Sequence, residues 1–193
     1  MTSVSILPFL AGAAHAGSVS WTGATSTDWF TDSNWEWGSG APTATDDARI
    51  GQTGVVINGA NAAAQTLYVG IVSDGSLAVE NGLSTTTTAL GWNAGWTGTV
   101  TVSGSLGTWT NSGSTYIGSD GIGIVNVLTG SEFLGGVVYL GSGVTGEGTL
   151  NVSDESHFEA SSFYVGYAGD GTFTLEEDAT ATTGRTVIAD GIG

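Results

Sequence analysis

A short phrase returns five times in this chain at nearly constant spacing. It reads GSLAV, GTVTV, GIVNV, GTLNV and GTFTL, and its starts are Gly75, Gly98, Gly123, Gly148 and Gly171. Successive starts lie 23, 25, 25 and 23 residues apart. A fixed period in the twenties is typical of a solenoid, in which each repeat buries its apolar face only by stacking on its neighbours. The repeat therefore constrains the architecture more tightly than any other feature of the sequence.

Composition agrees with strands rather than helices. The chain has 33 Gly, 2 Pro and no Cys among its 193 residues, and 40% of its residues are hydrophobic. Glycine-rich turns between short β-branched segments suit a β-solenoid, and no stretch shows a convincing helical period. Without Cys, neither disulfides nor thiolate metal sites can contribute. We expect residues 53–193 to form one elongated solenoid that continues beyond Gly193.

Alignment of the repeats predicts which side chains point inward. The first strand of each coil has alternating apolar positions, and period two sends both to one face: Leu77/Val79, Val100/Val102, Val125/Val127, Leu150/Val152 and Phe173/Leu175. A second strand contributes the inward column Val69, Leu90, Ile117, Leu140, Val165 and Ile188. A weaker third strand carries Trp109, Phe133, Phe158 and Ala181. The pattern predicts an all-β fold, a single parallel β-helix with about three short strands per 22–25-residue coil.

One residue before the second inward column, the side chains should point outward. That outward column reads Tyr68, Ala89, Tyr116, Tyr139, Tyr164 and Val187. Four tyrosines at equivalent places can stabilise the stack by ring packing, or they can form an exposed ligand-binding stripe, because Tyr is enriched at recognition surfaces. We favour the structural interpretation because the column runs down the whole stack.

The first residues have the pattern of a secretory signal. Residues 4–14 form an apolar run, and Ala14-His15-Ala16 offers small residues before a cleavage point at Gly17. The basic segment that normally precedes such a run is missing. An apolar run of this length is too short to cross a bilayer, which takes about 20 residues. We interpret residues 1–16 as a signal peptide of an exported protein, with no membrane insertion in this segment.

Residues 17–52 differ in composition from the repeats. Four of the seven Trp lie there, namely Trp21, Trp29, Trp35 and Trp37. A solenoid needs a terminal element that covers its open strand edges, and large apolar rings favour burial in such a cap. The alternative is a carbohydrate platform in which Trp29, Trp35 and Trp37 stack on sugars. We favour a Trp-rich N-terminal cap.

Charge excludes two classes of partner. The chain has 18 Asp and Glu against two Arg and no Lys, a formal net charge of -16. Nucleic-acid binding depends on a basic surface, and an anionic membrane would repel this chain. Neither partner is expected.

An acidic group offers the one arrangement with metal-binding or acid–base potential. If the fourth and fifth repeats stack in register, Asp154 lies over Glu177 and Glu155 over Asp178. Paired carboxylates can hold Ca²⁺ or, at roughly 5 Å separation, hydrolyse a glycosidic bond. Acidic residues on solvated turns are the commoner case. No serine triad is expected, because His157 has no identifiable partner in the sequence, and we predict a protein that is not an enzyme and needs no cofactor unless calcium binds here.

The repeats resemble those of bacterial autotransporter (type V secretion) passengers and of PEP-CTERM-associated repeat proteins. The resemblance rests on GTVTVSGSLGTWTNSGSTYIG, GTLNVSDESHFEASSFYVG and the opening segment WTGATSTDWFTDSNWEWGSGAP. It covers residues 19–193 and implies secretion or display on the surface of a Gram-negative bacterium. It carries over no catalytic residues.

Three functions follow as hypotheses. The first is a non-catalytic adhesin-like passenger or structural stalk, with a host or cell-surface glycan or protein as its partner. The second is a carbohydrate-binding or carbohydrate-degrading β-helix that uses the Trp cap or the acidic group. The third is a filament subunit that associates end to end through open strand edges.

Overall fold

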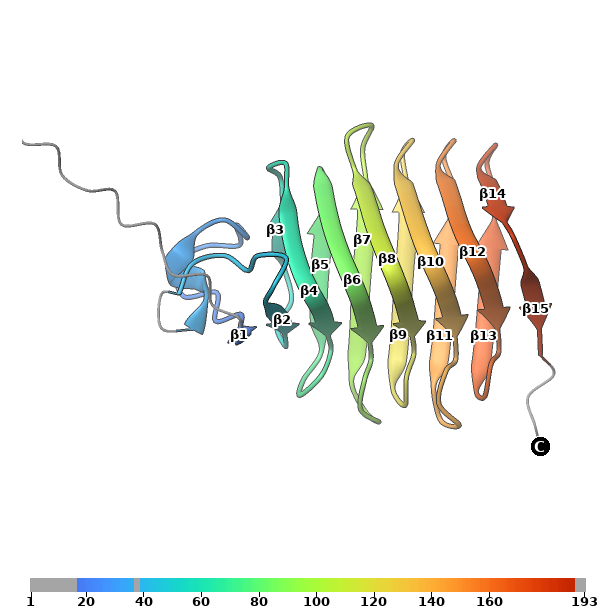
Figure 1. The fold of residues 1–193 in the computed structure, drawn as a ribbon, viewed down its shortest axis with the longest axis horizontal. Helices are drawn as coiled ribbons and strands as arrows, with labels where there is room; N and C mark the ends of the chain where they lie inside the picture. Colours follow the sequence, from blue (N-terminus) through green and yellow to red (C-terminus); the bar gives the residue numbers. More distant parts are fainter. Residues whose placement is uncertain (1–16, 37–38, 190–193) are drawn as a thin grey trace, which may run out of the picture.

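The computed structural model describes residues 17–36 and 39–189. The predicted signal peptide, Trp37 and the start of a further repeat at Gly193 lie outside the described residues. The described chain is a parallel β-solenoid, so the predicted fold class is confirmed (Figure 1). No helix in this part of the chain is long and apolar enough to cross a membrane.

Two parallel sheets form the body of the solenoid. The six-stranded sheet contains β3 (Val55–Ile57), β5 (Gly75–Val79), β7 (Thr97–Ser103), β9 (Ile122–Leu128), β11 (Glu147–Val152) and β13 (Asp170–Leu175). The nine-stranded sheet contains β1 (Ser18–Ser20), β2 (Asp47–Ile50), β4 (Ala62–Val69), β6 (Gly82–Leu90), β8 (Thr108–Ile117), β10 (Glu132–Leu140), β12 (His157–Val165), β14 (Thr180–Thr183) and β15 (Thr186–Ile188). From β3 to β12 the strands of the two sheets alternate along the chain, so each coil there contributes one strand to each sheet, and successive coils stack along the long axis of Figure 1.

The predicted inward columns are in register and line the core. In the six-stranded sheet Val100 pairs with Leu77 on one side and Val125 on the other, and all three are at most 1% exposed. The second column is continuous from Val69 to Ile188. The last coil departs from the expectation of burial, because Leu175 is 43% and Ile188 79% exposed where no further described coil covers them.

The coil has two strands rather than three over most of the solenoid. The segments predicted as third and second strands form one long strand, such as β8 or β10, and only the last coil divides them into β14 and β15. No residue within β8 or β10 has a positive φ, so no tight turn interrupts either strand. Shifts of register mark the bend, between Thr85 and Thr88 and between Gly135 and Val137. Bulges of this kind bend a strand while its pairing continues.

Buried polar side chains occupy the bend of β6 and β8. The Thr85 hydroxyl accepts hydrogen bonds from Trp109 Nε1 and Asn111 Nδ2, both at 3.0 Å. Asn111 Nδ2 also donates to the Thr88 hydroxyl at 2.9 Å, and its own oxygen accepts the Gly113 N–H at 3.0 Å. Thr85, Thr88 and Asn111 are therefore core residues whose polar side chains are paired with one another, whereas the buried Thr115 hydroxyl opposite Thr88 has no hydrogen-bond partner in the described chain.

An aromatic stack fills the core in the middle coils. The Trp109 and Phe133 rings lie 4.2 Å apart and nearly parallel, and Phe133 contacts Phe158 at 5.4 Å. All three side chains are fully buried. The third predicted column is thus an interior column of the nine-stranded sheet.

The Trp-rich segment forms the core of a cap at the N-terminal end. Trp29 and Trp35 are 0% and 1% exposed, and their rings meet edge to face at 4.8 Å. Trp35 Nε1 donates to the Trp29 carbonyl oxygen at 2.8 Å, and Trp21 packs against Trp35 at 5.1 Å. The buried Asn34, at the end of the short 3-10 helix η1 (Asp32–Asn34), ties the loop together through hydrogen bonds to Ser26, Asp28 and the Thr25 backbone.

Candidate functional site

The outward tyrosine column forms as the repeat predicts. Tyr116 pairs in register with Tyr139, and Tyr139 with Tyr164, on the outer face of the nine-stranded sheet. Tyr116 and Tyr139 stack with ring centroids 5.3 Å apart and an angle of 8°, and Tyr139 and Tyr164 stack at 4.9 Å and 11°. The three rings are half-buried. Because each ring packs against the next, the column is rigid and exposes mainly ring edges and hydroxyl groups.

Both arginines of the chain lie at the ends of this column. Arg49 Cζ lies 5.9 Å from the centre of the Tyr68 ring, and Arg185 Cζ lies 5.8 Å from that of Tyr164. Cations over aromatic faces at this range are attracted by about 0.5–1 kcal/mol at exposed sites. The only Lys or Arg side chains in the sequence are thus placed away from the centre of the column.

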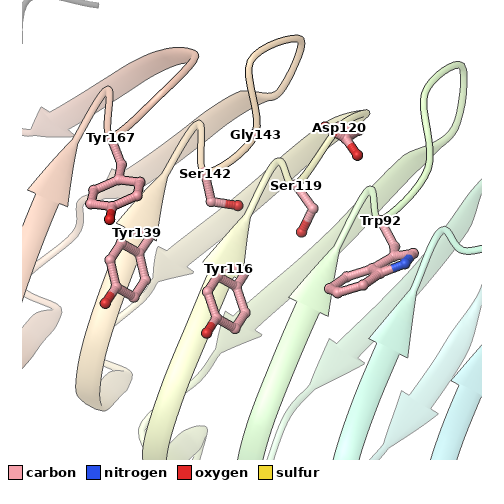
Figure 2. A pocket seen from close by; sticks show the side chains of 8 residues that line it. All are labelled: Trp92, Tyr116, Ser119, Asp120, Tyr139, Ser142, Gly143 and Tyr167. Carbon is pink, nitrogen blue, oxygen red and sulfur yellow. The ribbon is translucent and has the colours of Figure 1, made fainter.

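A second column, directly after the corner glycines, shapes the surface above the tyrosines. Its members differ in size, with two serines between larger side chains: Ile71, Trp92, Ser119, Ser142 and Tyr167. Trp92 folds back onto Tyr68 at 5.8 Å, whereas Tyr167 folds back onto Tyr139 and Tyr164 at 5.0 and 5.6 Å. The two serines between them, Ser119 and Ser142, place no ring over Tyr116 (Figure 2).

The result is an open groove of about 480 Å³, which we call the aromatic groove. Trp92 stands at one end and Tyr167 at the other, and they are 42% and 51% exposed. The remaining lining residues are Tyr116, Tyr139, Ser119, Asp120, Ser142 and Gly143. Three coil steps separate the two end rings, a length of about 14 Å at the usual strand spacing. The groove therefore runs across the strands, along the solenoid axis.

Polar groups of the groove are incompletely paired. Ser119 is 8% exposed, and its hydroxyl has no hydrogen-bond partner within the described chain. The Asp120 carboxylate is exposed and makes no hydrogen bond or ion pair to another described residue; only its backbone groups are paired. Burial raises the pKa of Tyr139 above its ordinary value of 10, and the neighbouring tyrosines add to the shift. The floor of the groove is thus neutral and offers phenolic O–H groups, while one carboxylate lies at its side.

The residues predicted from sequence fall into separate places. Tyr116 and Tyr139 line the groove, whereas Tyr68 and Tyr164 extend the column on either side of it. Trp29 and Trp35 are enclosed in the cap, so neither ring offers a face to a carbohydrate, and the platform interpretation is wrong for these two. Trp37 lies outside the described residues.

Sequence reasoning missed the residues that turn the column into a groove. Trp92, Ser119, Asp120, Ser142 and Tyr167 lie in corners that were treated only as turns. The sequence did contain a signal for the groove. The residue after each corner glycine differs in size between coils, whereas the glycines and the inward columns repeat with little change. Its meaning depends on the direction in which Trp92 and Tyr167 fold, which the sequence does not give.

The predicted acidic stack is present at the opposite corner of the coil. The Glu155 N–H donates to the Glu177 carbonyl oxygen at 3.0 Å, and all four residues have a positive φ. A side-chain hydrogen bond with Asp154 and the charge of that carboxylate raise the pKa of Glu177 above its ordinary 4.5. No group of three or more Asp, Glu, His or Cys side chains is arranged to hold a metal ion within residues 17–36 and 39–189. The stack of Asp154, Glu155, Glu177 and Asp178 therefore gives the calcium hypothesis no support.

His157 has partners that the sequence did not reveal. Its Nδ1 lies 2.8 Å from the Thr180 hydroxyl, and its Nε2 lies 3.9 Å from a Glu159 oxygen. The second distance is too long for a hydrogen bond. Thr180 and Glu159 are exposed, and none of the three residues lines the aromatic groove. The arrangement is a surface contact between neighbouring coils and lacks the enclosed site that a nucleophile needs.

Comparison of the chain with protein-family models, with curated proteins and with solved structures found no match. The aromatic groove combines two exposed rings with polar side chains that lack partners in the described chain, and it is therefore the candidate site.

Proposed function

We propose that the protein is a non-catalytic, surface-displayed solenoid of the adhesin-like kind, which holds its partner in the aromatic groove. The observation that carries the proposal is the groove itself, open to solvent and ended by two exposed rings, Trp92 and Tyr167. Tyr and Trp are enriched at recognition surfaces because they offer large contact areas at low conformational cost. The solenoid would serve as the spacer that presents this surface.

The support beneath the groove favours binding by a preformed surface. Tyr116 and Tyr139 are stacked on each other, and their strands are paired on both sides. A partner would therefore meet rings that are already ordered, and little conformational entropy would be lost on association. Rigid placement on a sheet distinguishes this groove from a flexible loop surface.

The lining of the groove favours binding over hydrolysis. Among the described residues, Asp120 is the one carboxylate that lines it, and no histidine does. Glycoside hydrolysis ordinarily needs two carboxyl groups that flank the scissile bond. The carbohydrate-degrading hypothesis is therefore the less supported form of the carbohydrate hypothesis.

Adhesion of coated beads tests the proposal. Beads carrying the full chain are passed over surfaces coated with mucin, deglycosylated mucin or a bacterial exopolysaccharide, and retention is counted. We expect retention on at least one surface and its loss in Ser142→Trp, which places a large ring between Trp92 and Tyr167. The matched control is Thr101→Trp, which places the same ring on the outer face of β7 in the other sheet.

Two results would contradict the proposal. Beads that are retained on none of the surfaces would leave a structural stalk as the better description. Beads whose retention is equal for the native chain and Ser142→Trp would show that adhesion uses another surface.

End-to-end association is a second candidate, supported by one observation. An apolar hollow of about 470 Å³ lies at the last described coil, lined in part by Phe163, Phe173 and Ile188. The opposite end is covered by the Trp cap, so tail-to-tail pairs fit this surface better than head-to-tail filaments. The mass of the full chain in solution should double with concentration if such pairs form, and Ile188→Lys should abolish the increase. A constant mass would remove this candidate.

A further inference from the structure

The ends of the aromatic groove are suited to flat rings. Trp92 and Tyr167 are exposed at its two ends, and Tyr116 and Tyr139 form the floor between them. One face of a sugar ring carries C–H groups and is apolar, so it packs well on an aromatic face. A lipid chain or an apolar peptide segment would satisfy this part of the groove equally well. The polar groups decide between these ligands.

The back of the groove requires hydrogen-bonding groups from its ligand. The buried Ser119 hydroxyl has no partner, and the Asp120 carboxylate has none for its side chain among the described residues. An apolar ligand would leave the Ser119 hydroxyl without a partner and would also cover the exposed Asp120 carboxylate, which costs free energy. The rim of a sugar ring carries hydroxyl groups that both donate and accept, and adjacent hydroxyls can donate together to one carboxylate.

The negative charge of the protein favours neutral sugars over anionic ones. The chain carries a formal charge of -16, and Asp120 is the charged member of the groove lining. Arg49 and Arg185 lie over Tyr68 and Tyr164, and neither of them lines the groove. No cationic side chain is therefore at hand to neutralise a uronic acid, sulfate or phosphate group, and the field of the chain repels such ligands.

We infer that the aromatic groove binds a short stretch of a neutral polysaccharide that lies along the solenoid axis, with sugar rings against Trp92 and Tyr167 and sugar hydroxyls on Ser119 and Asp120. The inference rests on the proposed function in that it names the ligand class of the same groove. The length between the end rings, about 14 Å, accommodates more than one sugar unit. The ligand is therefore an internal stretch of chain rather than a single terminal sugar.

Calorimetric titration of the full chain with defined oligosaccharides tests the inference. The neutral probes are cellohexaose, mannohexaose and N-acetylchitohexaose, and the anionic probe is hexagalacturonate. We expect measurable binding of at least one neutral probe and at least roughly tenfold weaker binding of the anionic one, because one unfavourable charge contact is worth a factor of this size. Equal or tighter binding of hexagalacturonate would overturn the inference, as would the absence of binding by all three neutral probes.

Three variants connect the binding to named groups. Ser119→Ala and Asp120→Asn should each weaken binding of the neutral probe roughly tenfold, the usual effect of losing one hydrogen bond to a ligand. Ser142→Trp should abolish it, whereas Thr101→Trp should leave it unchanged. Asp120→Asn keeps the shape of the side chain and should narrow the difference between neutral and anionic probes. Unchanged affinity in both Ser119→Ala and Asp120→Asn would overturn the inference.

The inference and the proposed function can fail separately. Beads that adhere through the groove but are not displaced by any neutral oligosaccharide would retain the proposed function and indicate a protein partner instead. Binding of a neutral oligosaccharide by a chain whose beads adhere to nothing would retain the inference and refute the adhesin-like role.

Discussion

The unpaired hydroxyl of Ser119 leads to a prediction about stability. Its Oγ is buried and has no hydrogen-bond partner in the described chain, and the residue as a whole is 8% exposed. A buried hydroxyl without a partner costs about 1–3 kcal/mol relative to its hydrated state. Removal of the oxygen in Ser119→Ala should therefore stabilise the free protein. Because the site borders an open groove, we expect a gain near the lower limit, about 1 kcal/mol.

The matched control is the same substitution at a satisfied serine. Ser131 is 1% exposed, its hydroxyl donates to the Val102 carbonyl oxygen at 2.9 Å, and it accepts the Leu128 N–H at 3.1 Å. Ser131→Ala leaves that N–H and that carbonyl without their partner, so we expect a loss of about 1–3 kcal/mol. The two variants remove the same atom and should change stability in opposite directions.

Thermal and urea unfolding measure both variants. For a chain of this length a change of 1 kcal/mol shifts Tm by about 2–4 °C, so Ser119→Ala should melt a few degrees higher and Ser131→Ala lower. Urea midpoints should move with unchanged slope if only stability changes. A loss of stability in Ser119→Ala comparable to that in Ser131→Ala would show that the Ser119 hydroxyl is already paired, for example by water. The reason for assigning it to a ligand would then disappear.

Three further predictions concern the coil. Gly118→Ala should lower the free energy of unfolding by at least about 3 kcal/mol or prevent folding, because φ is +74 there and a Cβ would overlap the backbone of the next coil. The control is Gly104→Ala, at φ +79 with open space around it, which should lower the free energy of unfolding by about 1 kcal/mol. Urea unfolding measures both. Phe133→Ala should cost about 3–5 kcal/mol and lower Tm, since the ring is fully buried between two aromatic neighbours; a loss below 1 kcal/mol would contradict the interior stack. The pKa of Glu177 is raised in the folded state, so protonation of this carboxyl group stabilises the fold. This contribution to the free energy of unfolding is fully present below the ordinary pKa of 4.5 and is lost as pH rises through the higher pKa of the folded state. Asp154→Asn should therefore raise Tm at neutral pH but not at about pH 3, and an equal rise at both would refute the coupling.

The repeat made the architecture predictable because each coil imposes the same constraint. Val100, for example, pairs with Leu77 in one neighbouring coil and with Val125 in the other. Because all three residues are apolar, three repeats together predict that this side chain points into the core. The tyrosine column was predictable for the same reason. Burial in the last coil was not, because Leu175 and Ile188 follow the pattern of the core without a further described coil to cover them.

Predictions failed where the fold departs from its own repeat. The repeat alignment predicted separate third and second strands, whereas β8 runs unbroken from Thr108 to Ile117, and Asn111 within it donates a hydrogen bond to Thr85 of the neighbouring coil. The cap was predicted from the tendency of Trp to be buried, and the enclosure of Trp29 and Trp35 agrees with it. In each case the deciding factor is a side-chain partner from another coil or loop, which a single sequence does not show.

The distribution of variation around the coil strengthens the assignment of the groove. The glycines that open each repeat are held constant by the backbone, since a Cβ at Gly98 or Gly148 would overlap main-chain atoms of the neighbouring coil. The position after the corner glycine has no such constraint, because a large ring is accommodated at Trp92 and a small side chain at Ser142. Packing therefore explains why every repeat opens with glycine, but it does not explain why the residue after the corner glycine is large in some coils and small in others. Packing does not fix the size of this side chain, and in the described chain its pattern leaves a hollow that exposed rings, the Ser119 hydroxyl and the Asp120 carboxylate line together.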